Sequence, residues 1–156
     1  MIQRIGIITG VDAEAAALFP GRSYDAEPLH GFLVRQVQFV GKDIAITCSG
    51  IGKVNAAMAA MMLAEHYHVQ LLLVVGTAGK LTDIAGDCFQ ITEAVQGDYG
   101  ASRHDRFAHY SAGAWPIGEE HVEPFRAKAT PDVGLPNVRI ITGDSFVESP
   151  DHGRRL

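Results

Sequence analysis

Two short runs of apolar and β-branched residues constrain the fold most, because each ends in a turn of small residues. Arg4–Thr9 and Leu71–Val75 are apolar on both faces, which is typical of strands buried inside a sheet. Val54–His66 lies between them and is rich in Ala, Met and Leu, so it predicts a helix. A strand, a helix and a second strand in this order predict an α/β fold.

The remaining segments predict that the sheet is mixed. Gly31–Phe39 and Asp43–Cys48 show alternating apolar residues on either side of a Gly41-Lys42 turn, which favours a hairpin. Residues 1–156 are expected to form a single α/β domain. The other expected elements are a helix at Asp12–Phe19, strands at Cys88–Val95 and Val138–Thr142, and a long irregular loop at Gln96–Gly118.

Composition narrows the functional classes. The chain has 13 basic and 18 acidic residues and a net charge of −5, so no nucleic-acid partner is expected. No apolar run approaches the ~18 residues of a membrane span, and the first residues do not form a signal peptide. Cys48 and Cys88 do not make a disulfide framework. A cytoplasmic protein with reduced thiols and no membrane partner is therefore expected.

Turns of small residues follow four of the expected strands. In an open α/β sheet, ligands bind beyond the carboxyl ends of strands, where glycines let backbone N–H groups approach a ligand closely. Any one of these turns could be an ordinary tight turn, but the four together favour a binding site. They are Thr9-Gly10, Ser49–Gly52, Gly76–Gly79 and Thr142–Ser145.

The Ser49–Gly52 turn matches neither common nucleotide motif. A P-loop would have Gly in place of Thr47 and Ser or Thr in place of Val54. A dinucleotide fingerprint would have a small residue in place of Asn55. ATP and NAD are therefore not expected as cofactors.

Glu14 is an acidic residue one helical turn beyond the first strand, within an Ala-rich segment. It is open whether Glu14 is a solvated charge favoured by the helix dipole or a carboxylate that orients or deprotonates water. No metal site is expected. His66 and His68 diverge on a helix, and neither His104 nor His109 has a Cys or carboxylate partner at a recognised zinc spacing.

Four motifs in the order IGIITGVDAEAAAL, SGIGKVNAA, VVGTAGKL followed by GDCFQITEA, and TGDSF span Ile5 to Phe146. Together they resemble the bacterial 5′-methylthioadenosine/S-adenosylhomocysteine nucleosidases of the purine nucleoside phosphorylase superfamily. The resemblance implies a three-layer α/β/α fold around a central mixed, twisted sheet, of the phosphorylase/hydrolase kind, and a homodimer. It implies cofactor-free, metal-free hydrolysis of the N-glycosidic bond of an adenine nucleoside thioether, releasing adenine.

The resemblance also implies roles for particular residues. Glu14 corresponds to the carboxylate that activates the attacking water, and Phe146 to the aromatic residue that stacks on the purine. A negative carboxylate near the anomeric carbon suits a transition state that resembles an oxocarbenium ion. The other implied substrate contacts are Val11 beside the ribose, Ile51 in the pocket for the 5′ substituent, Thr77, Ala78 and Gly79 beside the sugar and base, and Val147, whose main chain faces the base.

Some positions depart from related patterns. Phosphorolytic members of the superfamily carry arginines where this chain has Val74 and the segment Val11–Glu14, and an apolar residue cannot hold phosphate. Water is therefore expected as the nucleophile, with phosphorolysis as a less favoured alternative. Lys80 and the Gln96–Gly118 loop also differ from the family pattern, which leaves open a related specificity such as futalosine or adenosylhopane.

The end of the chain raises a second alternative. The family's catalytic Asp and its ribose-binding Glu follow the stretch that matches Thr142–Phe146, and the sequence reaches Leu156 before either of them. The fold is therefore expected to lack its last elements. A non-catalytic nucleoside-binding or assembly module is the alternative to an active hydrolase.

Overall fold

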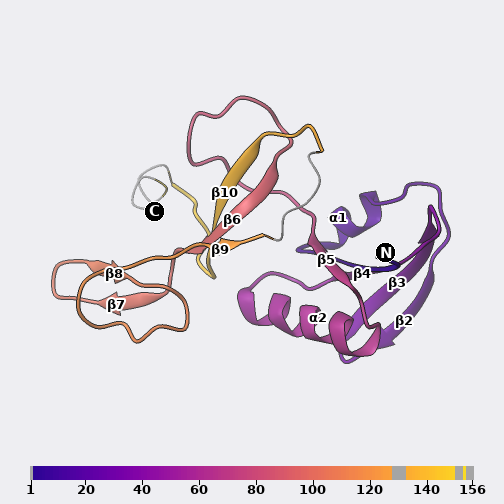
Figure 1. Ribbon diagram of the computed structural model, residues 1–156, viewed down its shortest axis with the longest axis horizontal. Coiled ribbons are helices and arrows are strands. Elements are labelled where there is room, and N and C mark those ends of the chain that lie inside the picture. Colours follow the sequence, from indigo (N-terminus) through magenta and orange to yellow (C-terminus); the bar gives the residue numbers. More distant parts are fainter. Residues whose placement is uncertain (1, 128–132, 150–152, 154–156) are drawn as a thin grey trace. The chain divides into compact units, whose positions relative to one another are not determined.

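The structure is a computed structural model that describes residues 2–127, 133–149 and 153 (Figure 1). It divides into two compact units, Met1–Gly79 and Lys80–Leu156. The single-domain organisation of the chain stays a prediction. Within the described residues, no helix is long and apolar enough to cross a membrane. Of the residues after Ser149, only Gly153 lies within the described part of the chain.

The first unit is built on a five-stranded mixed sheet. Its strands are β1 (Arg4–Thr9), β2 (Asp25–Leu29), β3 (Phe32–Phe39), β4 (Lys42–Cys48) and β5 (Leu71–Val74), in the spatial order β2-β3-β4-β1-β5. β1 pairs in parallel with both β4 and β5, whereas β2, β3 and β4 pair antiparallel. The parallel pairs place the carboxyl ends of β1, β4 and β5 at one edge of the sheet.

Helices cover both faces of this sheet (Figure 1). The two helices are α1 (Asp12–Ala17) and α2 (Lys53–His66). Ala15 of α1 belongs to a core cluster with Ile7, and Leu63 of α2 belongs to another with Ile8. Consecutive residues of a strand point to opposite faces, so α1 and α2 lie on opposite sides of β1. The three-layer arrangement implied by the resemblance is therefore present in this unit.

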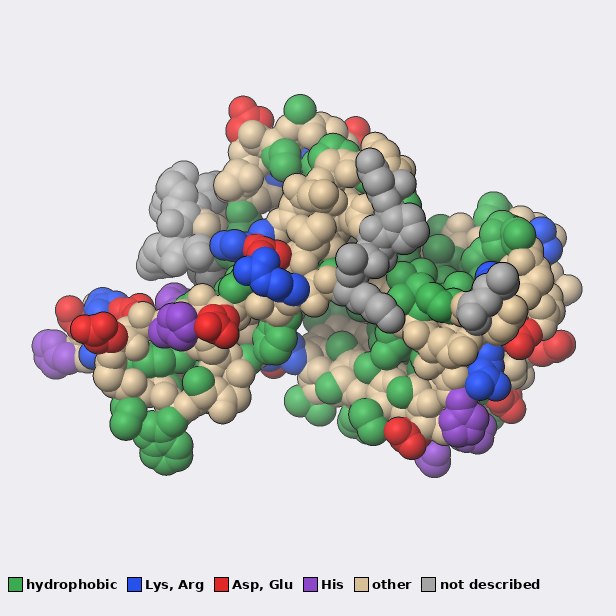
Figure 2. Space-filling model, in the orientation of Figure 1, with side chains coloured by type: hydrophobic (Ala, Val, Ile, Leu, Met, Phe, Trp, Pro, Cys, Tyr) green, Lys and Arg blue, Asp and Glu red, His purple; other side chains and the backbone are tan. Residues whose placement is uncertain are grey.

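The outer side of α2 is also apolar. Val54, Met58 and Met61 are exposed, although α2 already contributes Met62 and Leu63 to the core. Hydrophobic side chains lie along the exposed side of α2 (Figure 2). A helix that is apolar all round is typically covered on both sides.

Some predictions for the first unit are corrected. The first helix ends at Ala17 rather than Phe19, because Leu18 is already extended, with ψ of 137°, and Phe19 has a φ of +50°. β2 was not predicted, since it is exposed and contains Pro28, as edge strands can. β5 is not buried on both faces: Val74 is 82% exposed, and in the sheet of this unit β5 is an edge strand.

The second unit contains two small sheets. Its strands are β6 (Gln90–Gln96), β7 (Gly100–Ser102), β8 (Phe107–His109), β9 (Phe125–Arg126) and β10 (Asn137–Thr142). One sheet has the order β10-β6-β9 and the other pairs β7 with β8. Gln96–Gly118 was predicted to be an irregular loop, and this prediction is wrong in part because the segment contains the hairpin of β7 and β8. β6 and β10 run in parallel, so their carboxyl ends share an edge.

Candidate functional site

Backbone hydrogen bonds bring three strand-end turns of the first unit together. Ser49, which follows β4, donates its N–H to the carbonyl of Thr9 at 2.9 Å and its hydroxyl to the same oxygen at 3.2 Å. Val75, which follows β5, donates its N–H to the carbonyl of Ile8 at 3.0 Å. The turns expected to form a binding site therefore leave one edge of the sheet, on both sides of β1.

The carboxylate of Glu14 lies between two of these turns. Oε2 accepts hydrogen bonds from the backbone N–H of Gly10 at 2.9 Å and of Val11 at 3.2 Å. Oε1 accepts from the backbone N–H and the hydroxyl of Thr77, both at 2.8 Å. Two donors for each oxygen occupy about all the lone-pair positions that a carboxylate offers.

These contacts set the ionisation of Glu14. Burial acts to raise the pKa of Glu14, but hydrogen bonds from the Thr77 hydroxyl, the Thr77 N–H, Gly10 and Val11 together outweigh it and hold the pKa below its usual value. Glu14 is therefore a carboxylate at neutral pH. An ionised, half-buried carboxylate can accept a proton from a bound water.

Glu14 is both a helix cap and a link between strands. At the third position of α1, it accepts from the N–H of the N-cap residue Val11, as the acid of a capping box does. A cap needs no partner beyond its own helix, but Thr77 comes from the turn after β5, 63 residues away. The structure therefore excludes the interpretation of Glu14 as a freely solvated charge.

Gly76 makes room for this carboxylate. A Cβ built on Gly76 would lie 3.0 Å from both carboxylate oxygens of Glu14, closer than side chains normally approach. On the other side of the carboxylate, a Cβ on Gly10 would lie at an ordinary 3.6 Å from Oε2. A side chain at position 76 would therefore push the Glu14 carboxylate away from its present position.

Ile51 lies in the turn that joins β4 to α2. The glycines on either side, Gly50 and Gly52, have φ values of +76° and +112°, which side chains rarely adopt. The side chain of Ile51 is 76% exposed, and its carbonyl accepts a hydrogen bond from Asn55 at 3.1 Å. The turn thus presents an apolar side chain to solvent.

The structure brings Val11 and Thr77 each into contact with Glu14, and Ala78 and Gly79 follow Thr77 as exposed residues. Phe146 and Val147 belong to the second unit, after β10. Phe146 is 82% exposed.

Sequence reasoning missed the separate contributions of Gly10 and Gly76. Gly10 and Gly76 were visible only as members of small-residue turns.

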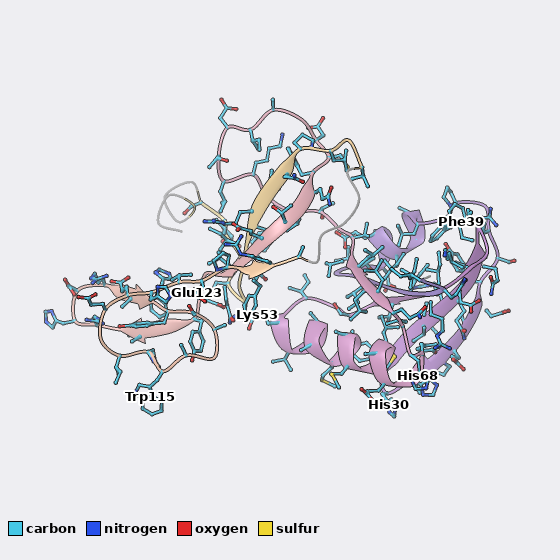
Figure 3. All side chains as sticks on the ribbon, viewed as in Figure 1. His30, Phe39, Lys53, His68, Trp115 and Glu123 are labelled. Atoms are coloured by element: carbon cyan, nitrogen blue, oxygen red, sulfur yellow. The ribbon has the colours of Figure 1, made fainter. Side chains whose placement is uncertain are left out.

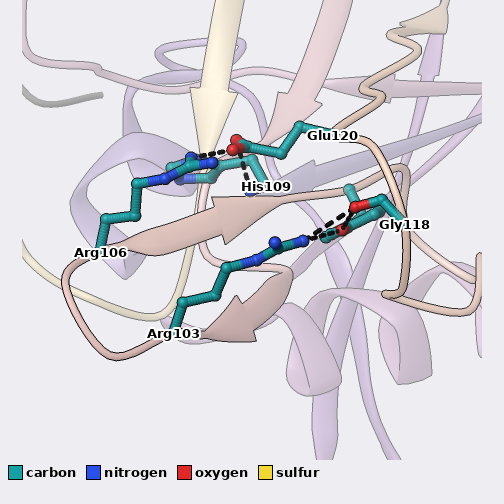
Figure 4. A network of polar contacts seen from close by, with 6 residues as sticks. Arg103, Arg106, His109, Gly118 and Glu120 are labelled. Atoms are coloured by element: carbon teal, nitrogen blue, oxygen red, sulfur yellow. Dashed lines mark hydrogen bonds and ion pairs between the residues drawn. The ribbon is translucent and has the colours of Figure 1, made fainter.

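The segment around β7 and β8 has its own polar network (Figure 4). Arg103 donates to the Tyr110 hydroxyl at 2.6 Å and to the Gly118 carbonyl at 2.9 Å. Glu120 pairs with Arg106 and accepts from the backbone N–H of His109. These bonds stabilise the hairpin and the chain that returns beside it.

The same segment exposes an aromatic side chain. Trp115 is 78% exposed and points away from β7 and β8 (Figure 3). The ring of His109 makes a polar contact through Nε2, which lies 3.0 Å from the Gly97 carbonyl. Among the described residues, no group of three or more His, Cys, Asp or Glu side chains is arranged to hold a metal ion.

Comparison with known sequences identifies the family. The model of the phosphorylase superfamily matches residues 4–155. A 5′-methylthioadenosine/S-adenosylhomocysteine nucleosidase of Shewanella denitrificans is 30% identical over 167 residues, which cover 95% of this chain and 68% of that protein. One of Oceanobacillus iheyensis is 30% identical, covering 94% of this chain and 67% of that protein. The chain belongs to the phosphorylase superfamily and, within it, to the family of these nucleosidases.

Solved structures agree on the fold. The structure of the Helicobacter pylori 5′-methylthioadenosine/S-adenosylhomocysteine nucleosidase (MTAN) has a TM-score of 0.75 at 23% identity. The match covers 97% of this chain and 72% of the Helicobacter chain. A putative nucleosidase of Francisella philomiragia has a TM-score of 0.77 at 24% identity, covering 99% and 70%. The futalosine hydrolase of Helicobacter pylori has a TM-score of 0.73 at 21% identity, covering 99% and 72%. At these identities the likeness confirms the predicted fold class alone.

Proposed function

We propose that this chain hydrolyses the N-glycosidic bond of adenine nucleoside thioethers, such as 5′-methylthioadenosine and S-adenosylhomocysteine, and releases adenine. The observation that carries the proposal is the Glu14 carboxylate, held at the carboxyl edge of the sheet by Gly10, Val11 and Thr77. The nucleosidases among its relatives support the same reaction class.

In the proposed reaction, Glu14 positions a water and takes its proton while the water oxygen bonds to the anomeric carbon. The bond from that carbon to the adenine nitrogen breaks with its electron pair, adenine takes a proton from solvent water, and Glu14 later returns its own proton to solvent. The negative charge of Glu14 also stabilises the positive charge that develops on the sugar. Because the low pKa keeps Glu14 ionised, both effects are available at neutral pH.

A water reaches Glu14 most easily at the oxygen bonded to Thr77. The other donors are backbone N–H groups, whose directions the chain fixes, whereas the Thr77 hydroxyl rotates and its residue is exposed. When the hydroxyl turns away, Oε1 regains a lone pair for the water. The Thr77 hydroxyl and the attacking water are therefore proposed to take turns as hydrogen-bond donors to Oε1 of Glu14.

The other proposed contacts divide between the two ends of the substrate. Val11, Ala78 and Gly79 are proposed to lie beside the ribose and base, and the exposed side chain of Ile51 to contact the apolar 5′ substituent. Phe146 is proposed to stack on the purine and Val147 to present its main chain to it. Stacking suits any purine, so Phe146 would contribute affinity more than discrimination.

Water is favoured over phosphate as nucleophile because Val74, where phosphorolytic relatives carry an arginine, offers no charge. The test is to incubate the purified chain with 5′-methylthioadenosine, with and without phosphate, and measure adenine by chromatography. Adenine release that needs no phosphate supports the proposal, whereas strict phosphate dependence identifies a phosphorylase. Binding of the nucleoside without release identifies a binding module.

Substrate choice is tested in the same assay. S-Adenosylhomocysteine and futalosine are offered at equal concentration beside 5′-methylthioadenosine. Preference for the thioethers supports the proposed substrate class, and preference for futalosine contradicts it.

We also propose that the chain is a homodimer and works in the cytoplasm. The apolar outer side of α2, with Val54, Met58 and Met61 exposed, supports the dimer, because a second copy would remove these side chains from water. The unpaired thiols of Cys48 and Cys88 suit a reducing compartment.

A further inference from the structure

Asp98 makes a contact between two strand-end turns of the second unit. β6 and β10 are parallel, and Gly97, directly after β6, donates its N–H to the carbonyl of Thr142 at 2.8 Å. The turns at the ends of the two strands therefore begin side by side. Asp98 is the second residue of one turn, and Gly143 and Asp144 open the other.

The carboxylate of Asp98 reaches across to the second turn. Its Oδ2 accepts a hydrogen bond from the backbone N–H of Asp144 at 2.7 Å. A Cβ built on Gly143 would lie 3.2 Å from both Cγ and Oδ2 of Asp98, tighter than ordinary contact. Gly143 does not have a positive φ, so a side chain there would act on this contact by pushing the Asp98 carboxylate a few tenths of an ångström away.

This contact matters for the exposed aromatic residue beyond the turn. Phe146 comes two residues after Asp144 and is 82% exposed, so packing around its ring contributes little to its position. The direction of the ring then depends mainly on the backbone that carries it. A charge-assisted hydrogen bond to that backbone is a strong restraint on it.

We propose that Asp98 is a positioning residue for base binding: by fixing the N–H of Asp144 over Gly143, it sets the direction in which Phe146 meets the purine. The inference rests on the proposed function, in which Phe146 stacks on adenine. Asp98 itself touches neither the substrate nor the reacting atoms in this proposal.

A double-mutant cycle on the full chain tests the inference, with adenine affinity measured by calorimetry. Phe146→Ala and Asp98→Ala are each expected to weaken adenine binding about tenfold, as loss of one base–aromatic stack does. The double variant is expected to bind no more weakly than Phe146→Ala, because both changes remove the same contact. Asp98→Asn keeps an oxygen for the Asp144 N–H and is expected to restore most of the affinity.

Hydrogen exchange at the Asp144 amide separates the turn from the ligand. Asp98→Ala is expected to speed this exchange at least tenfold, while Phe146→Ala and the control Asp105→Ala, in the exposed turn between β7 and β8, leave it unchanged. Independent, multiplying losses of affinity in the double variant would overturn the role of Asp98. The role of Asp98 would also be overturned if Asp98→Ala bound adenine normally while Phe146→Ala bound it weakly. If Phe146→Ala binds adenine normally, the proposed base site itself fails.

Discussion

Thr77 donates two hydrogen bonds, both 2.8 Å long, to the same carboxylate oxygen of Glu14. One comes from its backbone and one from its side chain, and the two residues follow different strands of the sheet. The pair joins the end of β1 to the end of β5 across the edge where ligands bind in α/β folds. The chemistry proposed for the first unit depends on this link.

Removing the charge of Glu14 should remove most of the activity. Glu14→Gln keeps the shape of the side chain but cannot accept a proton, so kcat for adenine release is expected to fall at least ~100-fold. Asp12→Asn is the matched control, because Asp12 is an exposed acid on the same short helix. Equal activity of Glu14→Gln and the parent protein would rule out Glu14 as the base.

The Thr77 hydroxyl should tune the pKa of Glu14. Thr77→Val removes that donor but keeps the backbone N–H, so the pKa of Glu14 should rise towards its usual value, and the acidic limb of the pH–rate profile should move to higher pH. Thr77→Ser keeps a hydroxyl and should leave the limb in place. A limb that does not move in Thr77→Val would show that another group governs it.

The same substitution should change stability in a pH-dependent way. A carboxyl whose pKa is lower in the folded state stabilises the fold above its unfolded pKa, and this contribution is lost as pH falls through the folded pKa. Thr77→Val should therefore lose about 1 kcal/mol at neutral pH, given the exposure of the site. Urea unfolding measures the free energy of unfolding of both proteins, and the difference between them should become smaller in acid. If the difference is the same at every pH, the lost hydrogen bond to the ionised carboxylate is not its cause.

Space at Gly76 should also matter for activity, although less than the charge of Glu14. Gly76→Ala places a methyl group 3.0 Å from both carboxylate oxygens, so Glu14 must move, and kcat should fall at least ~10-fold. Gly10→Ala places its methyl group at 3.6 Å from the same carboxylate and keeps its N–H, so it should cost less. Steady-state kinetics of the two variants compare them directly, and equal losses would contradict the steric argument.

The hairpin between β3 and β4 should be open to stabilisation. Its two-residue turn holds Val40, a β-branched residue at φ +49°, next to Gly41 at φ +68°. Asn-Gly suits such a turn, so Val40→Asn should raise the free energy of unfolding by about 1 kcal/mol. Val133→Asn, another exposed valine but without a positive φ, should give no increase. Thermal unfolding measures both, and a lower melting temperature for Val40→Asn would contradict the prediction.

A charge on the outer side of α2 should separate the proposed dimer. Met58→Lys and Met61→Lys place an ammonium group within the exposed apolar side, where a second copy would bury it at high cost. Light scattering after size-exclusion chromatography should show a mass near that of one chain. Val40→Lys changes an exposed apolar residue elsewhere and should leave the dimer intact. Unchanged dimers of both methionine variants would place the interface on another surface.

Much of the first unit could be predicted, because its strands combine apolar β-branched residues with clear turns. The helix expected at Val54–His66 is confirmed within one residue as α2, and the strand at Arg4–Thr9 is confirmed as β1. β2 could not be predicted from its own residues, since Asp25, Glu27 and Pro28 disfavour a strand. It forms because β3 offers it a partner, a non-local effect.

The second unit was predicted only in part: the strands expected at Cys88–Val95 and Val138–Thr142 correspond to β6 and β10, whereas the very short β7, β8 and β9 were not predicted. β7 depends on Gly100, where a Cβ would lie 2.0 Å from the carbonyl oxygen of Ala108. Only the paired structure reveals that close approach. For the candidate site, Glu14 and Thr77 were each predicted, but the bonds between them join residues that only the folded sheet brings together.

Three of the four donors to Glu14 are backbone N–H groups, from Gly10, Val11 and Thr77. A side-chain donor disappears with a single substitution, but among natural residues only proline removes an amide N–H. The three hydrogen bonds from these backbone N–H groups therefore remain after most substitutions in the turns around Glu14. Substitutions that leave Gly76 and Thr77 in place could change the other neighbouring side chains and keep Glu14 ionised, provided that the path of the backbone is unchanged.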